Sequence, residues 1–207
     1  EMGMLFIATR FSDEAERCFR NAQQLASDDV RWPYYLGHVL KNAGDLTATV
    51  ESFERARQLQ PTDLATLVWL GRVYLDLAQP VEAEARLTEA LSLYPNQPAV
   101  RFELGRAAVE QQDYARAVEQ LTTALTLDPE ATIVHYPLAM AYRGLGDLDN
   151  AAHHVERRGG RGMRGYTAGM AFKLPDPLVA ALNAVVVPTP QLYRDRGLDA
   201  AAAGNWP

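Results

Sequence analysis

Histidine and cysteine are the side chains that most often ligate metals or act as nucleophiles, and the 207-residue chain holds four histidines and one cysteine. A zinc site needs cysteine, histidine or carboxylate ligands at characteristic spacings, and neither His38 nor His135 belongs to such a set. His153 and His154 are adjacent, and adjacent residues do not share a helical face. Cys18 lies next to a predicted core position and has no basic partner nearby in sequence. We therefore predict no catalytic residue, no metal site and no cofactor.

A basic, glycine-rich stretch is the next candidate for chemistry, because such segments can contact phosphate. Residues 156–165 read ERRGGRGMRG. They lack both the Lys-Ser/Thr ending and the preceding strand of a phosphate-binding loop, and no aromatic residue is interleaved with the arginines. We favour a solvated linker over a phosphate or acidic-partner contact. The net charge of −6 also argues against nucleic acid as a partner, since phosphate neutralisation supplies most non-specific affinity.

Aromatic and basic side chains recur in three columns with a spacing of 34 residues. The candidate binding residues in these columns are Tyr34, Phe102 and Tyr136, then His38, Arg72 and Arg106, and finally Lys41 and Arg143. The columns stand three or four residues apart, which places them on one face of a helix. They predict a groove that is aromatic and basic on an acidic protein, suited to a peptide with acidic and apolar side chains. The alternative is that the aromatic residues are core and the arginines are solvated.

The spacing of 34 extends to the elements that would position these columns. Steps of 34 land on Gly or Ala at five positions: Gly3, Gly37, Gly71, Gly105 and Ala139. Apolar columns accompany them, including Phe53 and Leu87 sixteen residues after Gly37 and Gly71. Small residues allow two helix backbones to approach closely while large side chains fill the space between them. The pattern predicts two antiparallel helices per unit.

Turn residues mark the ends of the predicted helices. Gly44-Asp45 and Gly146-Asp147 each combine a glycine that accepts the left-handed conformation at a helix end with an aspartate that caps the next helix. Gln112-Asp113 keeps only the capping half of this device. Pro61, Pro95 and Pro129 then separate successive units, where a missing amide donor costs little. Pro137 breaks the pattern, because we expect it to kink the first helix of the fourth unit.

These columns resemble the tetratricopeptide repeat (TPR) family, which has a 34-residue period. The cleanest match comes from one unit, through Leu67, Leu70-Gly71, Tyr74, Ala83, Leu87, Ala90 and Pro95. The resemblance implies an all-α, right-handed superhelical solenoid of antiparallel helix pairs, whose first helices line a concave groove. Members that bind chaperone tails clamp a terminal carboxylate with Lys and Asn. No Asn pair stands on this face, which argues against that role.

The expected organisation divides the chain into seven parts. They are a partial first TPR at 1–29, three TPRs at 30–63, 64–97 and 98–131, a degenerate TPR at 132–158, an insertion at 159–190, and the first helix of a further, truncated TPR at 191–207. The insertion should contain a Gly/Arg-rich loop and a short helix that Asp176 caps and Pro177 begins. Because repeats are cut at both ends, we expect the chain to be part of a longer protein, and self-association through the open repeat ends is a further expectation.

Two functional hypotheses follow. The first is a protein–protein interaction scaffold or adaptor that binds a partner peptide or subunit in its groove. The second is a regulatory or docking domain of a larger enzyme or electron-transfer protein whose catalytic part lies outside this stretch. No membrane span is expected, because the apolar run at 178–187 has about half of the ~20 residues that cross a bilayer. The sequence leaves the partner and the compartment open.

Overall fold

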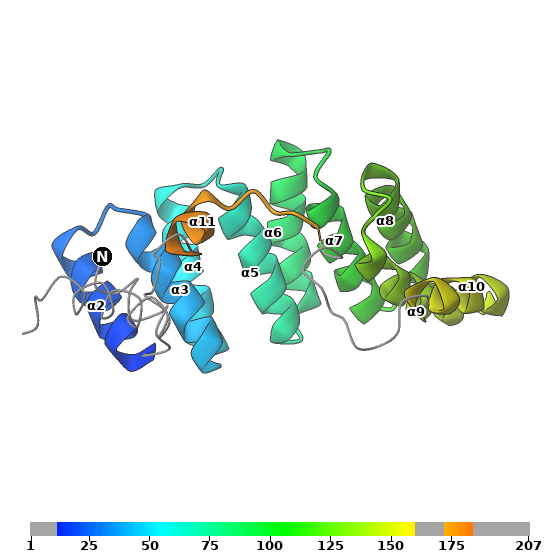
Figure 1. The fold of residues 1–207 in the computed structure, drawn as a ribbon, viewed down its shortest axis with the longest axis horizontal. Helices are drawn as coiled ribbons and strands as arrows, with labels where there is room; N and C mark the ends of the chain where they lie inside the picture. The colour runs from blue at the N-terminus through cyan, green and yellow to red at the C-terminus, as the bar shows by residue number, and fades with distance from the viewer. Residues whose placement is uncertain (1–11, 160–171, 184–207) are drawn as a thin grey trace, which may run out of the picture.

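The computed structural model describes residues 12–159 and 172–183. Its helices are α2 (Ser12–Leu25), α3 (Arg31–Ala43), α4 (Leu46–Leu59), α5 (Leu64–Asp76), α6 (Pro80–Leu93), α7 (Pro98–Glu110), α8 (Tyr114–Leu127), the 3₁₀ turn η1 (Thr132–Val134), α9 (His135–Gly144), α10 (Leu148–Gly159) and α11 (Pro177–Asn183). From α2 to α10, each helix packs against the next one in the chain, and together they form an elongated row (Figure 1). The prediction of an all-α solenoid of helix pairs is confirmed.

The recurring glycines place the two helices of each pair in close contact. A Cβ atom built on Gly37 would lie 2.8 Å from the ring of Phe53, and one on Gly71 would lie 2.6 Å from the side chain of Leu87. Gly105 meets Leu121 in the same way. Real Cβ atoms do not approach other atoms this closely, so any larger residue would force the facing side chain or the helices to move. The period of 34 therefore repeats one packing contact.

The turn between the two helices of each unit also recurs. Asp45 accepts a hydrogen bond from the amide of Ala48 at 3.0 Å, and Asp113 accepts one from the amide of Arg116 at 3.2 Å, as expected for capping aspartates. Four positions spaced by 34 share a positive φ, namely Gly44 (85°), Ala78 (55°), Gln112 (61°) and Gly146 (80°). The fold thus requires the left-handed conformation even where the residue is not glycine.

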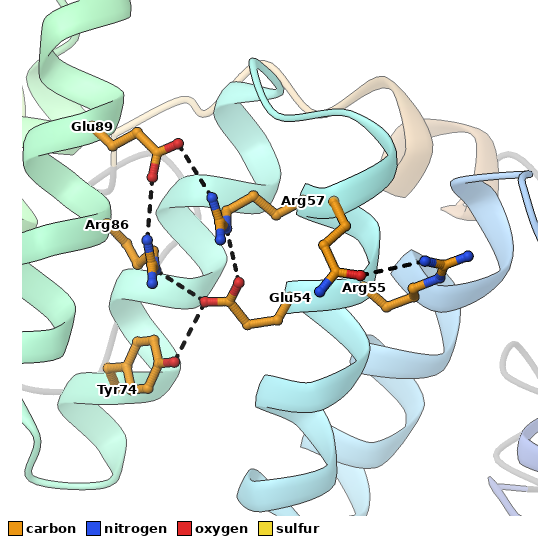
Figure 2. A network of polar contacts seen from close by, with 7 residues as sticks. Glu54, Arg55, Arg57, Tyr74, Arg86 and Glu89 are labelled. Carbon is orange, nitrogen blue, oxygen red and sulfur yellow. Dashed lines mark hydrogen bonds and ion pairs between the residues drawn. The ribbon is translucent and has the colours of Figure 1, made fainter.

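Ion pairs connect neighbouring units on the second helices. Glu54 of α4 contacts Arg57 at 2.8 Å and Arg86 of α6 at 2.9 Å, while Glu89 of α6 contacts both arginines at 3.4–3.5 Å (Figure 2). The hydroxyl of Tyr74 lies 3.5 Å from Glu54. All four charged side chains are 20–32% exposed. Each glutamate in this network contacts one arginine of α4 and one of α6. Such networks can stabilise a fold, whereas isolated surface ion pairs contribute little.

The fourth unit departs from the others at its start. Helix α9 begins at His135, after the turn η1, so Pro137 lies in the first helical turn. An amide there has no intrahelical acceptor to lose, which is why proline is tolerated. The expected kink within the helix is replaced by a later helix start. Ala139 stands in the glycine column of this unit. Val155, which stands two periods after Leu87 in the same column, is 59% exposed. The expectations for residues 1–11 and 191–207 lie outside the described residues.

Candidate functional site

A segment from the C-terminal part of the chain lies on the face formed by the first helices. Residues 172–176 are extended and lead into α11. In Figure 1 this segment, drawn in orange, runs from α7 past α5 to α3. Its direction is opposite to the order of the repeats. We call residues 172–183 the resident segment and the surface beneath it, formed by α3, α5 and α7, the concave face.

Asp176 is the polar centre of this contact. Its Oδ2 atom accepts a hydrogen bond from the Tyr34 hydroxyl at 2.5 Å and another from the Trp69 indole Nε1–H at 2.9 Å. Its Oδ1 atom accepts from the amide of Val179 at 2.8 Å and so caps α11, as the sequence predicts. Burial, together with the hydrogen bond to this carboxylate, raises the pKa of Tyr34. The phenol therefore stays protonated and acts as a donor.

Apolar side chains continue the contact on both sides of Asp176. Phe172 is buried, and its ring centroid lies 5.3 Å from that of Phe102 on α7. Leu174 packs against all three clusters of the hydrophobic core. On α11, Leu182 is buried, and Leu178 and Val179 pack against the cluster around α3. The resident segment thus spans three repeats with an aromatic residue, a leucine and a carboxylate.

His38 lies beside the carboxylate site among aromatic rings. Its ring centroid is 4.9 Å from Tyr34, 5.2 Å from Phe53 and 4.8 Å from Trp69. Its Nε2 atom is buried without a hydrogen-bond partner among the described residues. Burial lowers the pKa of His38 to about 4, assisted by Lys41 and opposed by Asp176. The ring is therefore neutral at pH 7.

Two predicted groove arginines share one buried carboxylate. Glu103, whose side chain is 2% exposed, accepts from Arg72 Nε at 2.6 Å and from Arg106 Nη1 at 2.7 Å. Arg72 also stacks on Trp69, with its guanidinium carbon 4.9 Å from the ring centroid. Lys41 approaches the same ring at 5.7 Å. Glu103 offsets part of the positive charge that the sequence places on this face.

The structure separates the predicted site residues into two groups. Tyr34 and Phe102 are buried at 0% and 5% exposure and contact the resident segment. His38, Lys41 and Arg72 contact Trp69 beside it, and Arg106 is connected to Arg72 through Glu103. Tyr136 is 51% exposed and Arg143 is exposed, both on α9. The buried residues of α9, Leu138 and Ala141, share a hydrophobic cluster with Phe172 of the resident segment.

The histidines on α9 and α10 form a small cluster. The Nδ1 atoms of His135 and His154 lie 3.0 Å apart, and Tyr142 stacks on His154 with the rings 9° from parallel. Burial lowers the pKa of both His135 and His154. Within residues 12–159 and 172–183 there is no group of three or more potential metal ligands. No helix in these ranges is long and apolar enough to cross a membrane.

Trp69, Glu103 and Asp176 were not among the sequence-predicted site residues. Trp69 and Glu103 stand two positions before the recurring glycine, whereas the predicted column stands three before it. The spacing of Trp69 to Arg72, three residues on a helix, was the available signal. Asp176 was expected only to cap α11. Its contacts to Tyr34 and Trp69 span 142 and 107 residues, so no local pattern indicates them.

The architecture defines a helical-repeat solenoid, with an extended segment bound on the face of its first helices. Two family models described as tetratricopeptide repeat match residues 40–101 and 102–160. The chain belongs to the tetratricopeptide repeat family. A comparison with curated proteins found no match.

Several solved structures share the fold. A crystal structure of MamA protein has a TM-score of 0.70 and 18% identity, covering 76% of this chain and 86% of that one. MamA 41-end from Desulfovibrio magneticus RS-1 has a TM-score of 0.71 and 23% identity, covering 75% and 88%. YrrB, described as a TPR protein with an unusual peptide-binding site, has a TM-score of 0.65 and 20% identity, covering 75% and 80%. At these identities the similarity establishes the fold.

Proposed function

We propose that the protein is an interaction scaffold or adaptor whose concave face binds a peptide segment of a partner protein. The observation that carries this proposal is the resident segment itself, a stretch of polypeptide seated on three successive repeats through side chains. TPR arrays are protein-interaction folds that offer extended concave surfaces. The face combines aromatic rings with hydrogen-bond donors, the composition that orients a peptide through a few polar contacts.

The partner segment is proposed to carry acidic and apolar side chains. Tyr34 and Trp69 donate hydrogen bonds to a carboxylate, and Phe102 contacts an aromatic ring. Lys41 and the arginines Arg72 and Arg106 surround these positions with positive charge, which Glu103 reduces but does not cancel. Toward α9, Met140 and Arg143 are exposed on the first helix of the next unit. We propose that a partner contacts this helix as well.

Photo-crosslinking from defined positions tests this proposal. A photoreactive phenylalanine replaces Met140, which is 40% exposed on the first helix α9, or Val81, which is 65% exposed on the second helix α6 and serves as the matched control. In native lysate we expect Met140 to crosslink a discrete partner and Val81 not to do so. Equal crosslinking of one protein from both positions, or crosslinking from Val81 alone, would place binding outside the concave face and refute the proposal.

A further inference from the structure

The resident segment contacts the array as an extended peptide ligand does. Phe172, Leu174 and Asp176 face the concave surface, whereas Lys173 and Pro175 are exposed. This alternation is the period of two that an extended chain imposes on its side chains. Specificity in such binding comes from sites for alternate side chains. The segment therefore reveals three successive sites on the concave face.

The first two sites are apolar and differ in what they accept. Phe172 meets the ring of Phe102 in a tilted arrangement, with 50° between the ring planes, a geometry that favours an aromatic residue. Leu174 is partly buried and packs against every core cluster, so its site lies where the repeats meet. An aliphatic side chain of this length reaches several repeats at once, whereas a polar one would lose its hydration there without a partner.

The third site reads a carboxylate. Two neutral donors from different repeats, the hydroxyl of Tyr34 on α3 and the indole N–H of Trp69 on α5, converge on the same oxygen of Asp176. Both donors are held in place by packing: Tyr34 against Phe53 and His38, and Trp69 between His38 and Arg72. Hydrogen bonds to an ionised acceptor are about twice as strong as neutral ones. The site therefore distinguishes Asp from its amide.

We infer that the partner bound by the concave face carries the pattern aromatic-x-Leu-x-Asp, and that it binds by displacing the resident segment. This inference rests on the proposed function and specifies its ligand and its regulation. Because the segment is part of the same chain, it competes with an effective concentration on the order of millimolar. An external peptide can bind only those molecules in which the face is free, so its apparent affinity equals its intrinsic affinity multiplied by the fraction of such molecules. The segment is thus a built-in competitor.

The test uses the full chain and a fluorescent synthetic peptide, FKLPDPLVAALN, which has the sequence of residues 172–183. Three proteins are compared by fluorescence anisotropy: the wild type, the variant Leu174→Ser/Asp176→Asn that weakens the resident segment, and Lys173→Ser/Pro175→Ser as a matched control at exposed positions. Circular dichroism verifies that all three are helical. We expect the weakened variant to bind the peptide at least about tenfold more tightly than the other two proteins.

Specificity is read from a second peptide in which the residue corresponding to Asp176 is Asn. It should bind the weakened variant about tenfold less tightly than the parent peptide, because the charge-assisted hydrogen bonds are lost. Equal affinity of the parent peptide for all three proteins would overturn the competition, and equal affinity of both peptides would overturn the carboxylate site. Both failures leave the crosslinking result intact. Sedimentation of the unlabelled proteins identifies a remaining outcome, in which the segment seats on a second copy, and this also overturns the inference.

Discussion

Glu103 is a buried charge whose partners are two half-buried arginines. These surroundings predict that a triple variant is more stable than the double variant from which it derives. The double variant Arg72→Met/Arg106→Met leaves the carboxylate 2% exposed with neither ion-pair partner. An uncompensated buried charge costs about 3–5 kcal/mol. The triple variant Arg72→Met/Glu103→Met/Arg106→Met removes that charge and replaces the cluster by apolar side chains. We expect the triple variant to be more stable than the double variant in urea unfolding followed by circular dichroism.

This cluster also bears on how the concave face can be mutated. Arg72→Glu would place a second carboxylate beside Glu103 and destabilise the array, so a loss of binding in that variant would report unfolding. Methionine retains most of the arginine stem while removing its charge. A double variant as stable as the triple one would show that Glu103 is not left as an uncompensated buried charge when the two arginines are removed.

His38 predicts a dependence of stability on pH. Because burial lowers its pKa to about 4 in the folded protein, the unfolded chain binds the proton first as the pH falls below about 6.5. The contribution of neutral His38 is therefore complete above pH 6.5 and is lost between pH 6.5 and about 4. Integrated over this window, the loss is about 3 kcal/mol.

The variant His38→Gln isolates this effect. His135 and His154, whose pKa values are also lowered, titrate in both proteins, so their contributions cancel in the difference. Urea unfolding at pH 7, 5.5 and 4 should show that the free energy of unfolding of the wild type falls more steeply with acid than that of the variant. Parallel pH profiles would mean that His38 is accessible to water and titrates normally in the folded protein.

In the turns between paired helices, we predict that two substitutions to glycine raise the stability of the protein. Ala78 and Gln112 adopt the left-handed conformation at positions where Gly44 and Gly146 stand in the neighbouring units. A non-glycine residue in this conformation is strained by roughly 1–2 kcal/mol. Substitution by glycine relieves this strain, but the larger conformational entropy of glycine in the unfolded chain offsets part of the gain in stability. We expect Ala78→Gly and Gln112→Gly each to stabilise the protein by about 0.5–1 kcal/mol, measured by thermal and urea unfolding.

Gly44→Ala is the matched opposite change. No atom lies within 4 Å of a Cβ built on Gly44, so its effect comes from the backbone alone and should destabilise by a similar amount. Because two substitutions far from each other act independently, the double variant Ala78→Gly/Gln112→Gly should show the sum. Destabilisation by either glycine would mean that the turn relaxes to a conformation with negative φ at no cost.

Helix pairs could be predicted from the sequence because their determinants are local and repeated. The contact between Gly71 and Leu87 spans 16 residues, and the caps at Asp45 and Asp113 span three, so each appears as a column with a period of 34. The candidate face could be predicted in part for the same reason, although Trp69 lies one position away from the expected column. The return of residues 172–183 could not be predicted, because its partners lie in other repeats and its docking occurs only once.

That return changes how the whole molecule should unfold. In a solenoid, each repeat contacts only its neighbours, and stability is close to a sum of repeat and interface contributions. The resident segment adds contacts across 107 and 142 residues of sequence, and α11 packs on α3. We therefore expect the resident segment to couple α3, α5 and α7 directly. The first units of the array are then stabilised by a segment that follows α10 in the chain.

Hydrogen exchange measured by mass spectrometry resolves this coupling by helix, since local opening sets the protection of each region. In the variant Leu174→Ser/Asp176→Asn, amides of α3 and α5 should lose protection relative to the wild type. Those of α10 should change little, because α10 contributes no residue to the hydrophobic clusters that the segment joins in the described structure. Lys173→Ser/Pro175→Ser should match the wild type throughout. A uniform loss across all helices would indicate a single cooperative unit, and no loss in α3 would show that the array holds its first repeats without the segment. Either pattern would contradict the prediction that the resident segment stabilises only the repeats that it contacts.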